Sequence, residues 1–484
     1  MSRPSPPTDL AAEGDVNLSP LRRAWESRHI GVATRALLDA DSEYFLHQSL
    51  STPCLNALRA CEGIWLEDVE GRRIMDFHGN SVHQVGYRHP QVMEAVKHML
   101  DTLPFSPRRF TNDAAIGLAT RLARLAPDPL GKVLFAPGGT LAIGMALKLA
   151  RMVTGRHKTL SLWDSFHGAS LDAISIGGEA IFRKGIGPLL PGAEHAAPCD
   201  PRHCRFGCGG TCSLRCAEYL DYVLSKEEDV GAVIIETVRS TDVQVPPPEY
   251  YRIVRDACDR HGALLILDEV PICLGRTGRM FAFEHYGIVP DMVVLGKGLG
   301  GGVFPMAALI ARSDFDVAAD RALGHYTHEK SSVGCAAGLA TLTVIEQERL
   351  VERSRALGLA ALERLQAIQR QHPLVADVRG IGLLLGLELE RDGQPAAREA
   401  EQVMYECLSQ GLSFKVGQGN VLTLSPPMII SAEDLNRALD IIDAALKVVE
   451  GDATKRGGAP TQAASARHEP APEQATSKRV AGDG

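Results

Sequence analysis

The stretch LLILDEVPICLGRTGRMFAFEHYGIVPDMVVLGKGLGGGVFP, residues 264–305, decides the fold. It contains two short apolar runs, LLIL and MVVL, and a residue with reactive chemistry follows each: Asp268 after the first and Lys297 after the second. Short runs that are apolar throughout are typical of strands buried on both faces, as in a parallel sheet covered by helices. The stretch therefore predicts two such strands, with a carboxylate and an amine at their ends.

Short apolar runs alternate with amphipathic segments in both directions from this stretch. Further strands are predicted at residues 132–137, 158–163, 231–238 and 305–311, and helices at 141–153 and 248–262. Beyond about residue 333 long helices dominate, with strands predicted at 383–390 and 421–427. This order of elements favours an α/β fold.

We expect two domains and two disordered ends. The large domain, residues 76–333, is predicted to hold a mostly parallel sheet flanked by helices. A smaller α+β domain is predicted to combine residues 16–75 with residues 334–450. Residues 1–15 and 451–484 are rich in proline, alanine, glycine and polar residues, so they lack the apolar surface that would order them.

The composition excludes several classes of protein. The 484 residues are 45% hydrophobic and 23% charged, as in ordinary globular proteins, and the net charge is -8. Because no basic face or tail is present to neutralise phosphates, we expect no nucleic-acid partner. No apolar run approaches the length of a membrane span, and the N-terminus lacks the apolar core of a secretory signal. These features predict a cytoplasmic protein without a membrane partner.

Three predicted loops at strand ends carry the chemistry, where ligands of such sheets bind. Gly138, Gly139 and Thr140 precede a helix whose free N–H groups suit a phosphate, although a Gly-Gly pair is commonly just a turn. Asp268 is either a cap or the partner of a positively charged ligand atom, and Lys297 is either an ion-pair partner or a desolvated amine. Pyridoxal phosphate needs such a phosphate cup, a carboxylate and a lysine. A nicotinamide-dependent oxidoreductase is disfavoured, because GKGLGGG lacks the GxGxxG spacing.

From about Gly63 to Ala445 the chain resembles the class III aminotransferase family, which are fold-type-I pyridoxal-phosphate enzymes. The resemblance implies pyridoxal 5'-phosphate as the cofactor and a small-molecule amine as the substrate. It implies that Lys297 is the catalytic lysine that binds the cofactor and shuttles protons, and that Asp268 pairs with the ring nitrogen. The other cofactor-binding residues that it implies are Gly139 and Thr140 at the phosphate, Phe166 on the ring, His167 beside it, and Thr327. Because the family's threonine reaches the phosphate from the neighbouring subunit, Thr327 implies a homodimer.

The chain departs from the family at three positions. Pro271 stands where many members have a glutamine at the phenolic oxygen of the cofactor. Thr423 replaces the arginine that grips the α-carboxylate of 2-oxoglutarate, and Thr241, five residues after Glu236, replaces the glutamate that pairs with that arginine. Because a bidentate arginine–carboxylate contact is strong, its absence disfavours the common amino acceptor. Elimination is therefore favoured over transamination, and an aminotransferase with an unusual acceptor stays open.

The stretches FLHQSLSTPCLNALRACEG and DFHGNSVHQVGY resemble a lyase branch of the family that acts in aminophosphonate breakdown. This resemblance implies a small hydroxylated aminophosphonate as substrate, with phosphonoacetaldehyde and ammonia as products. A phosphonate dianion needs cations, for which the candidates are Arg108, Arg109, Arg239 and Lys415, each of which is otherwise a solvated surface charge. Asn80 and His83 are candidates for facing the substrate.

The stretch CDPRHCRFGCGGTCSLRC, residues 199–216, holds five of the eleven cysteines. Cys204, Cys208, Cys212 and Cys216 recur at every fourth position, but the glycines among them favour a loop over a helix. Four thiolates can close a structural zinc site, and free thiols packed as small apolar residues are the alternative. No residue is predicted to bind a catalytic metal, and the Asp268–Lys297 pair disfavours metal binding as the main activity.

Overall fold

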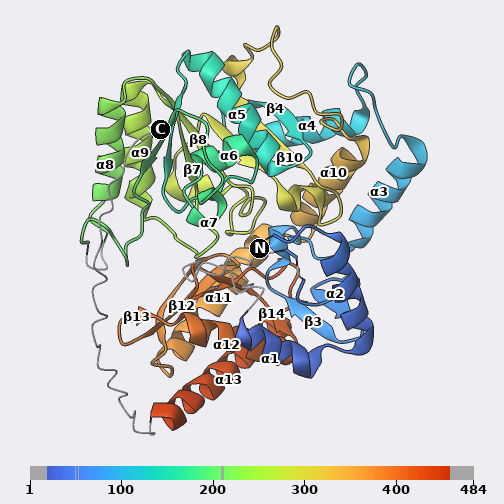
Figure 1. Ribbon diagram of the computed structural model, residues 1–484. Coiled ribbons are helices and arrows are strands. Elements are labelled where there is room, and N and C mark those ends of the chain that lie inside the picture. Colours follow the sequence, from blue (N-terminus) through green and yellow to red (C-terminus); the bar gives the residue numbers. More distant parts are fainter. Residues whose placement is uncertain (1–18, 49–50, 53, 209–211, 458–484) are drawn as a thin grey trace, which may run out of the picture.

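The computed structural model in Figure 1 describes residues 19–48, 51–52, 54–208 and 212–457. The predicted disordered N-terminus and residues 458–484 lie outside the described residues. Helix α13 (Ala432–Gly457) extends past Gly451, the expected start of the C-terminal tail. Within the described part of the chain, no helix is both long and apolar enough to cross a membrane.

A seven-stranded sheet forms the centre of the upper lobe in Figure 1, and the α/β fold with a mostly parallel sheet is confirmed. The first six strands are β4 (Leu130–Ala136), β5 (Lys158–Leu162), β6 (Ala193–Ala196), β7 (Val230–Glu236), β8 (Leu264–Asp268) and β9 (Met292–Leu295). Strand β10 (Ala307–Arg312) runs antiparallel to both of its neighbours, β4 and β9. The other pairs are parallel, and the order is β4-β10-β9-β8-β7-β5-β6.

Helices cover both faces of this sheet, which explains why its strands are apolar throughout. Along β9, Met292 and Val294 pack into a core shared with α5 (Gly139–Thr154), while Val293 and Leu295 face the opposite core. The helices of that second core include α4 (Asp113–Leu125), α8 (Arg215–Lys226), α9 (Pro248–His261) and α10 (Ser332–Gln347). The remaining helices of this region are α3 (Pro90–Thr102), α6 (Leu171–Ile176) and α7 (Ala180–Arg183).

The lower lobe in Figure 1 is a smaller α+β unit built from both ends of the chain. One antiparallel sheet contains β11 (Val375–Ile381), β12 (Leu384–Arg391), β15 (Lys415–Gly417) and β16 (Val421–Leu424), with the short β13 (Gln394–Pro395) on β12. A second sheet joins β1 (Leu58–Glu62), β2 (Trp65–Asp68) and β3 (Arg73–Asp76) to β14 (Leu412–Ser413). Helices α1 (Pro20–His29), α2 (Val32–Tyr44), α11 (Leu350–Gln369), α12 (Ala397–Ser409) and α13 complete it.

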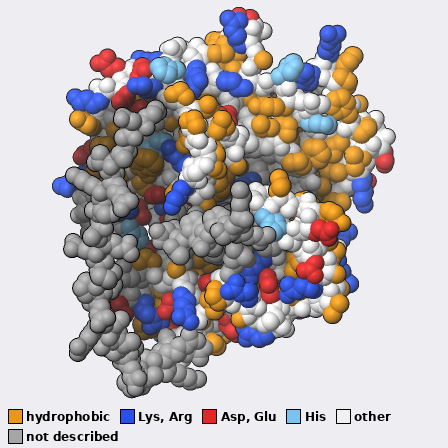
Figure 2. Space-filling model, viewed as in Figure 1, with side chains coloured by type: hydrophobic (Ala, Val, Ile, Leu, Met, Phe, Trp, Pro, Cys, Tyr) orange, Lys and Arg blue, Asp and Glu red, His pale blue; other side chains and the backbone are white. Residues whose placement is uncertain are grey.

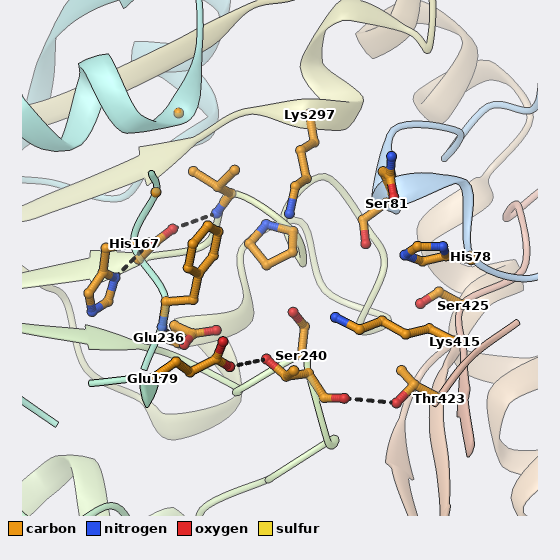
Figure 3. Close-up of a pocket in the computed structure, with 18 of the residues that line it drawn as sticks. His78, Ser81, His167, Glu179, Glu236, Ser240, Lys297, Lys415, Thr423 and Ser425 are labelled. Carbon is orange, nitrogen blue, oxygen red and sulfur yellow. Dashed lines mark hydrogen bonds and ion pairs between the residues drawn. The ribbon is translucent and has the colours of Figure 1, made fainter. Parts of the chain in front are cut away.

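The carboxyl ends of the parallel strands point toward the smaller lobe. Glu236 and Asp268 are opposite one another in the register of β7 and β8, and Lys297 follows β9 as the first residue of the 3-10 turn η3 (Lys297–Gly300). Strands β15 and β16 of the smaller lobe lie across from this edge (Figure 3). The pairing of parallel strands thus brings the two reactive residues of the 264–305 stretch to one edge.

Candidate active site

A pocket of about 450 Å³ lies between the carboxyl edge of the large sheet and strands β15 and β16. This volume is in the range of sites for small molecules and cofactors. The pocket is lined by Phe77, His78, Asn80, Ser81, Gly139, Thr140, Phe166, His167, Gly168, Glu179, Phe182, Glu236, Ser240, Thr241, Asp268, Val270, Pro271, Lys297, Lys415, Thr423 and Ser425. Six of the seven predicted cofactor-binding residues are therefore together.

Lys297 projects into the pocket from the edge of the large sheet, as Figure 3 shows. Its backbone is left-handed, with φ 46°, which is uncommon for a residue with a side chain and is found at functional sites. Burial lowers the pKa of Lys297, the carboxylates of Asp268 and Glu236 oppose this effect, and the ammonium of Lys415 adds to it. A larger neutral fraction makes the amine a better nucleophile and base.

Asp268 is buried at the end of β8 and held in one orientation. Its Oδ2 lies 2.8 Å from Nδ1 of His167, and its Oδ1 accepts the backbone N–H of Val270 at 3.0 Å. A carboxylate fixed in a buried site stabilises a cation placed against it. The protonated ring nitrogen of pyridoxal phosphate is a suitable cation, and His167 serves to orient the carboxylate.

The glycine loop before α5 fits a phosphate. Gly138 is extended and no side chain caps the helix, so the first N–H groups of α5 are directed at the pocket edge. A Cβ on Gly139 would lie 3.1 Å from Cγ1 of Val270, so glycine permits this close approach. The hydroxyl of Thr140 accepts the N–H of Ser170 at 3.2 Å and adds a polar group to the loop.

Two aromatic rings and a buried glutamate form another part of the pocket lining. The ring centroids of Phe166 and Phe182 are 4.4 Å apart, and the backbone N–H of Phe166 donates to Oε1 of Glu236 at 3.0 Å. Burial raises the pKa of Glu236. Phe166 and Val270 both line the pocket and can cover the two faces of a planar ring between them. The residues present therefore fit pyridoxal phosphate in shape and in charge.

Thr327 is the predicted cofactor residue that does not join this group. It is exposed on the loop before α10 and does not line the pocket of its own chain. Its assignment to the phosphate of a neighbouring subunit stays a prediction.

The smaller lobe supplies a polar wall. Lys415 of β15 and Thr423 of β16 are opposite one another in register, and both line the pocket with Ser425. The hydroxyl of Thr423 donates to the carbonyl oxygen of Thr241 at 2.9 Å. The two positions at which the chain lacks the family's arginine and glutamate therefore touch one another, and Pro271 lies in the same pocket.

Of the four cations proposed from the sequence for the phosphonate, Lys415 lines the pocket and the others do not. Arg239 is buried against Asp242, with its Nε 2.7 Å from Oδ1. Arg108 lies 2.7 Å from the ring of His325 on the surface, and Arg109 is exposed. None of these three arginines lines the pocket of its own chain, so their assignment to the phosphonate stays a prediction.

Asn80 and His83, the two candidates from the HGNSVHQ stretch, differ in their position relative to the pocket. Asn80 lines the pocket, whereas His83 is buried behind it, with Nε2 3.1 Å from the carbonyl oxygen of Asp76. Burial lowers the pKa of His83 to about 4, so it is a neutral structural residue.

Several lining residues were not found from the sequence: His78, Ser81, Glu179, Phe182, Ser240 and Ser425. His78 and Ser81 flank Asn80, so proximity to that loop was the available signal. Glu179 lies between two short helices, where no periodic pattern marks it, and it accepts the hydroxyl of Thr241 at 3.4 Å.

The cysteine-rich stretch lies outside the pocket, and its grouping differs from the expected one. Cys212 and Cys216 lie with Cys199, and Cys204 instead pairs with Cys208. The spacing of four residues did not identify this set, because Cys199 approaches the others through the fold of the loop.

The model of the family "Aminotransferase class-III" matches residues 48–446, and the chain belongs to this family. It is an enzyme that depends on pyridoxal phosphate, which the pocket fits, and its family processes small-molecule amines.

Among the relatives, the (R)-1-hydroxy-2-aminoethylphosphonate ammonia-lyase of Vibrio splendidus is 49% identical over 460 residues, 91% of this chain and 96% of that protein. The acetylornithine aminotransferase of Caldanaerobacter subterraneus is 33% identical over 398 residues, 80% of this chain and 94% of that protein. Among solved structures, the taurine:2-oxoglutarate aminotransferase of Bifidobacterium kashiwanohense, in complex with PLP and glutamate, is similar with a TM-score of 0.80 and 27% identity. The match covers 87% of this chain and 98% of that chain.

Proposed function

We propose that this enzyme is an ammonia-lyase that converts (R)-1-hydroxy-2-aminoethylphosphonate into phosphonoacetaldehyde and ammonia. The observation that carries the proposal is the 49% identity over 91% of the chain to the ammonia-lyase of Vibrio splendidus. The contact between Thr241 and Thr423 supports it, because these positions offer no cation for the carboxylate of a keto-acid acceptor. An aminotransferase is the second candidate, supported more weakly by the family and by relatives such as the acetylornithine enzyme.

The pocket residues have distinct roles toward the cofactor. We assign Gly139 and Thr140 to its phosphate, Phe166 to one face of its ring, and Asp268 with His167 to its ring nitrogen. When bound, pyridoxal phosphate withdraws electrons from the carbon that carries the substrate amine, which makes a C–H bond at that carbon acidic.

Lys297 moves the proton. Its neutral amine takes the proton from the amine-bearing carbon, and the C–O bond on the neighbouring carbon breaks as a C=C bond forms. The oxygen takes up a proton and leaves as water, and we assign the ammonium of Lys297 as the donor of that proton. The released aminovinylphosphonate tautomerises and adds one water, which yields the aldehyde and ammonia. One water leaves and one enters, so no acceptor is consumed.

Lys415 is our assignment for the phosphonate. It lines the pocket on the wall opposite the large sheet, and its charge interacts with that of Lys297, so the two amines lie close enough for one small substrate (Figure 3). Ser81 and Ser425 add hydroxyl donors on the same side. A dianion beside an ammonium and two hydroxyls is held by charge-assisted hydrogen bonds.

We also propose a homodimer in which Thr327 completes the phosphate site of the neighbouring subunit. Hydrophobic side chains gather on the upper right of the face in Figure 2, the region of α3, α4 and α10 in Figure 1. Leu103, Phe105 and Phe110 follow α3 along the chain and are exposed, and the ring of Phe105 contacts that of His328, next to Thr327. Exposed apolar patches of this kind mark protein interfaces.

Ammonia release without an acceptor tests the proposed reaction. Purified holoenzyme with (R)-1-hydroxy-2-aminoethylphosphonate is expected to release ammonia over many turnovers, and added 2-oxoglutarate is expected to yield no glutamate. The matched control is 2-aminoethylphosphonate, which lacks the leaving hydroxyl and is expected to release none. Aldehyde that forms only with added 2-oxoglutarate, with glutamate in equal amount and no ammonia, would establish the aminotransferase instead.

A further inference from the structure

The loop between β6 and α8 brings several cysteine sulfurs together, away from the active-site pocket. The sulfur atoms of Cys199, Cys212 and Cys216 all lie within 4.8 Å of one another, and those of Cys199 and Cys212 are 3.8 Å apart. Cys199 and Cys216 are buried, and Cys212 is half-buried. Cys216 lies in the first turn of α8, so the cluster is anchored on a helix of the main core.

The separation of the sulfurs fits shared coordination of a metal ion. Zinc–sulfur bonds of about 2.3 Å at tetrahedral angles place two sulfurs about 3.8 Å apart. A disulfide would need about 2.05 Å, so Cys199 and Cys212 are free thiols. Apolar packing alone accounts for the burial of Cys199 but gives no reason for three sulfurs from separate turns to meet.

Cys208 is suited to be the fourth ligand. Its sulfur accepts the backbone N–H of Ser213 at 3.3 Å, the residue directly after Cys212. It also accepts from the thiol of Cys204 at 2.9 Å. Hydrogen bonds from N–H and S–H groups favour a thiolate. Cys204 therefore acts as an outer donor to Cys208.

We propose that Cys199, Cys208, Cys212 and Cys216 bind one Zn²⁺ ion as a structural site. Four thiolates are the soft ligand set that zinc prefers, and a closed set leaves no position for a substrate. The proposal rests on the cysteine geometry and is independent of the reaction assigned to the pocket.

The position of the loop indicates what the ion stabilises. Arg202, between the proposed ligands, makes an ion pair with Glu390 of β12 at 2.6 Å, and His203 lies 3.0 Å from Oε1 of Glu388. These contacts connect the loop to the smaller lobe, whose strand β15 carries Lys415. Zinc in the cluster would thus fix a bridge between the two lobes without touching the reacting atoms.

Metal analysis of tag-free holoenzyme tests the proposal. We expect about one zinc per chain in the parent protein and almost none in Cys199→Ser or Cys212→Ser. Cys258→Ser is the matched control, because Cys258 is a buried thiol on α9, beside α8 and outside the cluster. Cys204→Ser is expected to keep its zinc, because Cys204 donates to a ligand and does not bind the ion.

Two further measurements keep the test decisive if a variant folds poorly. Replacing zinc by Co²⁺ in the parent protein is expected to give the ligand-field bands of a tetrahedral thiolate site in the red, away from cofactor absorption. Bound pyridoxal phosphate, measured in each variant, reports whether the main fold is intact. A parent protein without metal or cobalt bands would overturn the proposal. Zinc that persists in both Cys199→Ser and Cys212→Ser, with cofactor bound, would overturn it as well.

Discussion

Replacing Lys415 by methionine removes the cation that we assign to the phosphonate while keeping a long side chain. A hydrogen bond to a charged group is worth about 1.5–3 kcal/mol, and partial burial of Lys415 places its contact in the upper half of that range. A loss of about 2–3 kcal/mol corresponds to a decrease of about 30- to 150-fold in kcat/KM. Because the phosphonate is not attached to the carbon that loses its proton, most of the decrease is expected in KM.

Steady-state ammonia release measures this effect, and two controls isolate the charge. Lys415→Arg retains a cation and is expected to keep KM within about 5-fold of the parent value, since the loss of contact geometry costs less than the loss of charge. Inhibition by methylphosphonate is expected to weaken in Lys415→Met by a factor similar to that of KM. The absorption of the bound cofactor is expected to be unchanged in both variants.

An unchanged KM and an unchanged inhibition constant in Lys415→Met would show that Lys415 does not bind the phosphonate. In that case the phosphonate is held elsewhere, and the register pairing of Lys415 with Thr423 has only a structural meaning. A decrease confined to kcat would instead place Lys415 in proton transfer.

Lys297→Ala is expected to lower turnover at least about 10,000-fold, while the cofactor stays bound through Gly139, Thr140 and Asp268. Borohydride reduction followed by peptide mapping is expected to label Lys297 in the parent protein and no residue in the variant. The kcat is expected to rise with pH on the acid side of its profile as Lys297 becomes neutral. Lys415 helps to lower the pKa of Lys297. This acid limb is therefore expected to move to higher pH in Lys415→Met and to stay in place in Lys415→Arg. The double variant Thr241→Glu with Thr423→Arg restores opposite charges at two residues in contact, and measurable glutamate formation from 2-oxoglutarate is expected in it and in neither single variant.

The sequence by itself determined the central sheet and the reactive residues at its edge. The runs LLIL and MVVL became β8 and β9, because short, fully apolar segments can be buried only between layers. The carboxylate and the amine that follow these runs meet because adjacent parallel strands end at the same edge. Both properties depend on the local pattern of apolar and polar residues, which the sequence shows directly.

Only the tertiary structure decided which polar residues accompany that pair. Arg239 and Lys415 were equal candidates in the sequence, but Arg239 turns to Asp242, three residues away, while the pairing of β15 with β16 places Lys415 in the pocket. Cys199 joined Cys212 and Cys216 in the same way, through a loop whose path has no periodic signal. Convergence of side chains from distant segments depends on strand register, loop path and competing ion pairs. These interactions join residues that are far apart in the sequence, so the spacing of residues along the chain does not predict them.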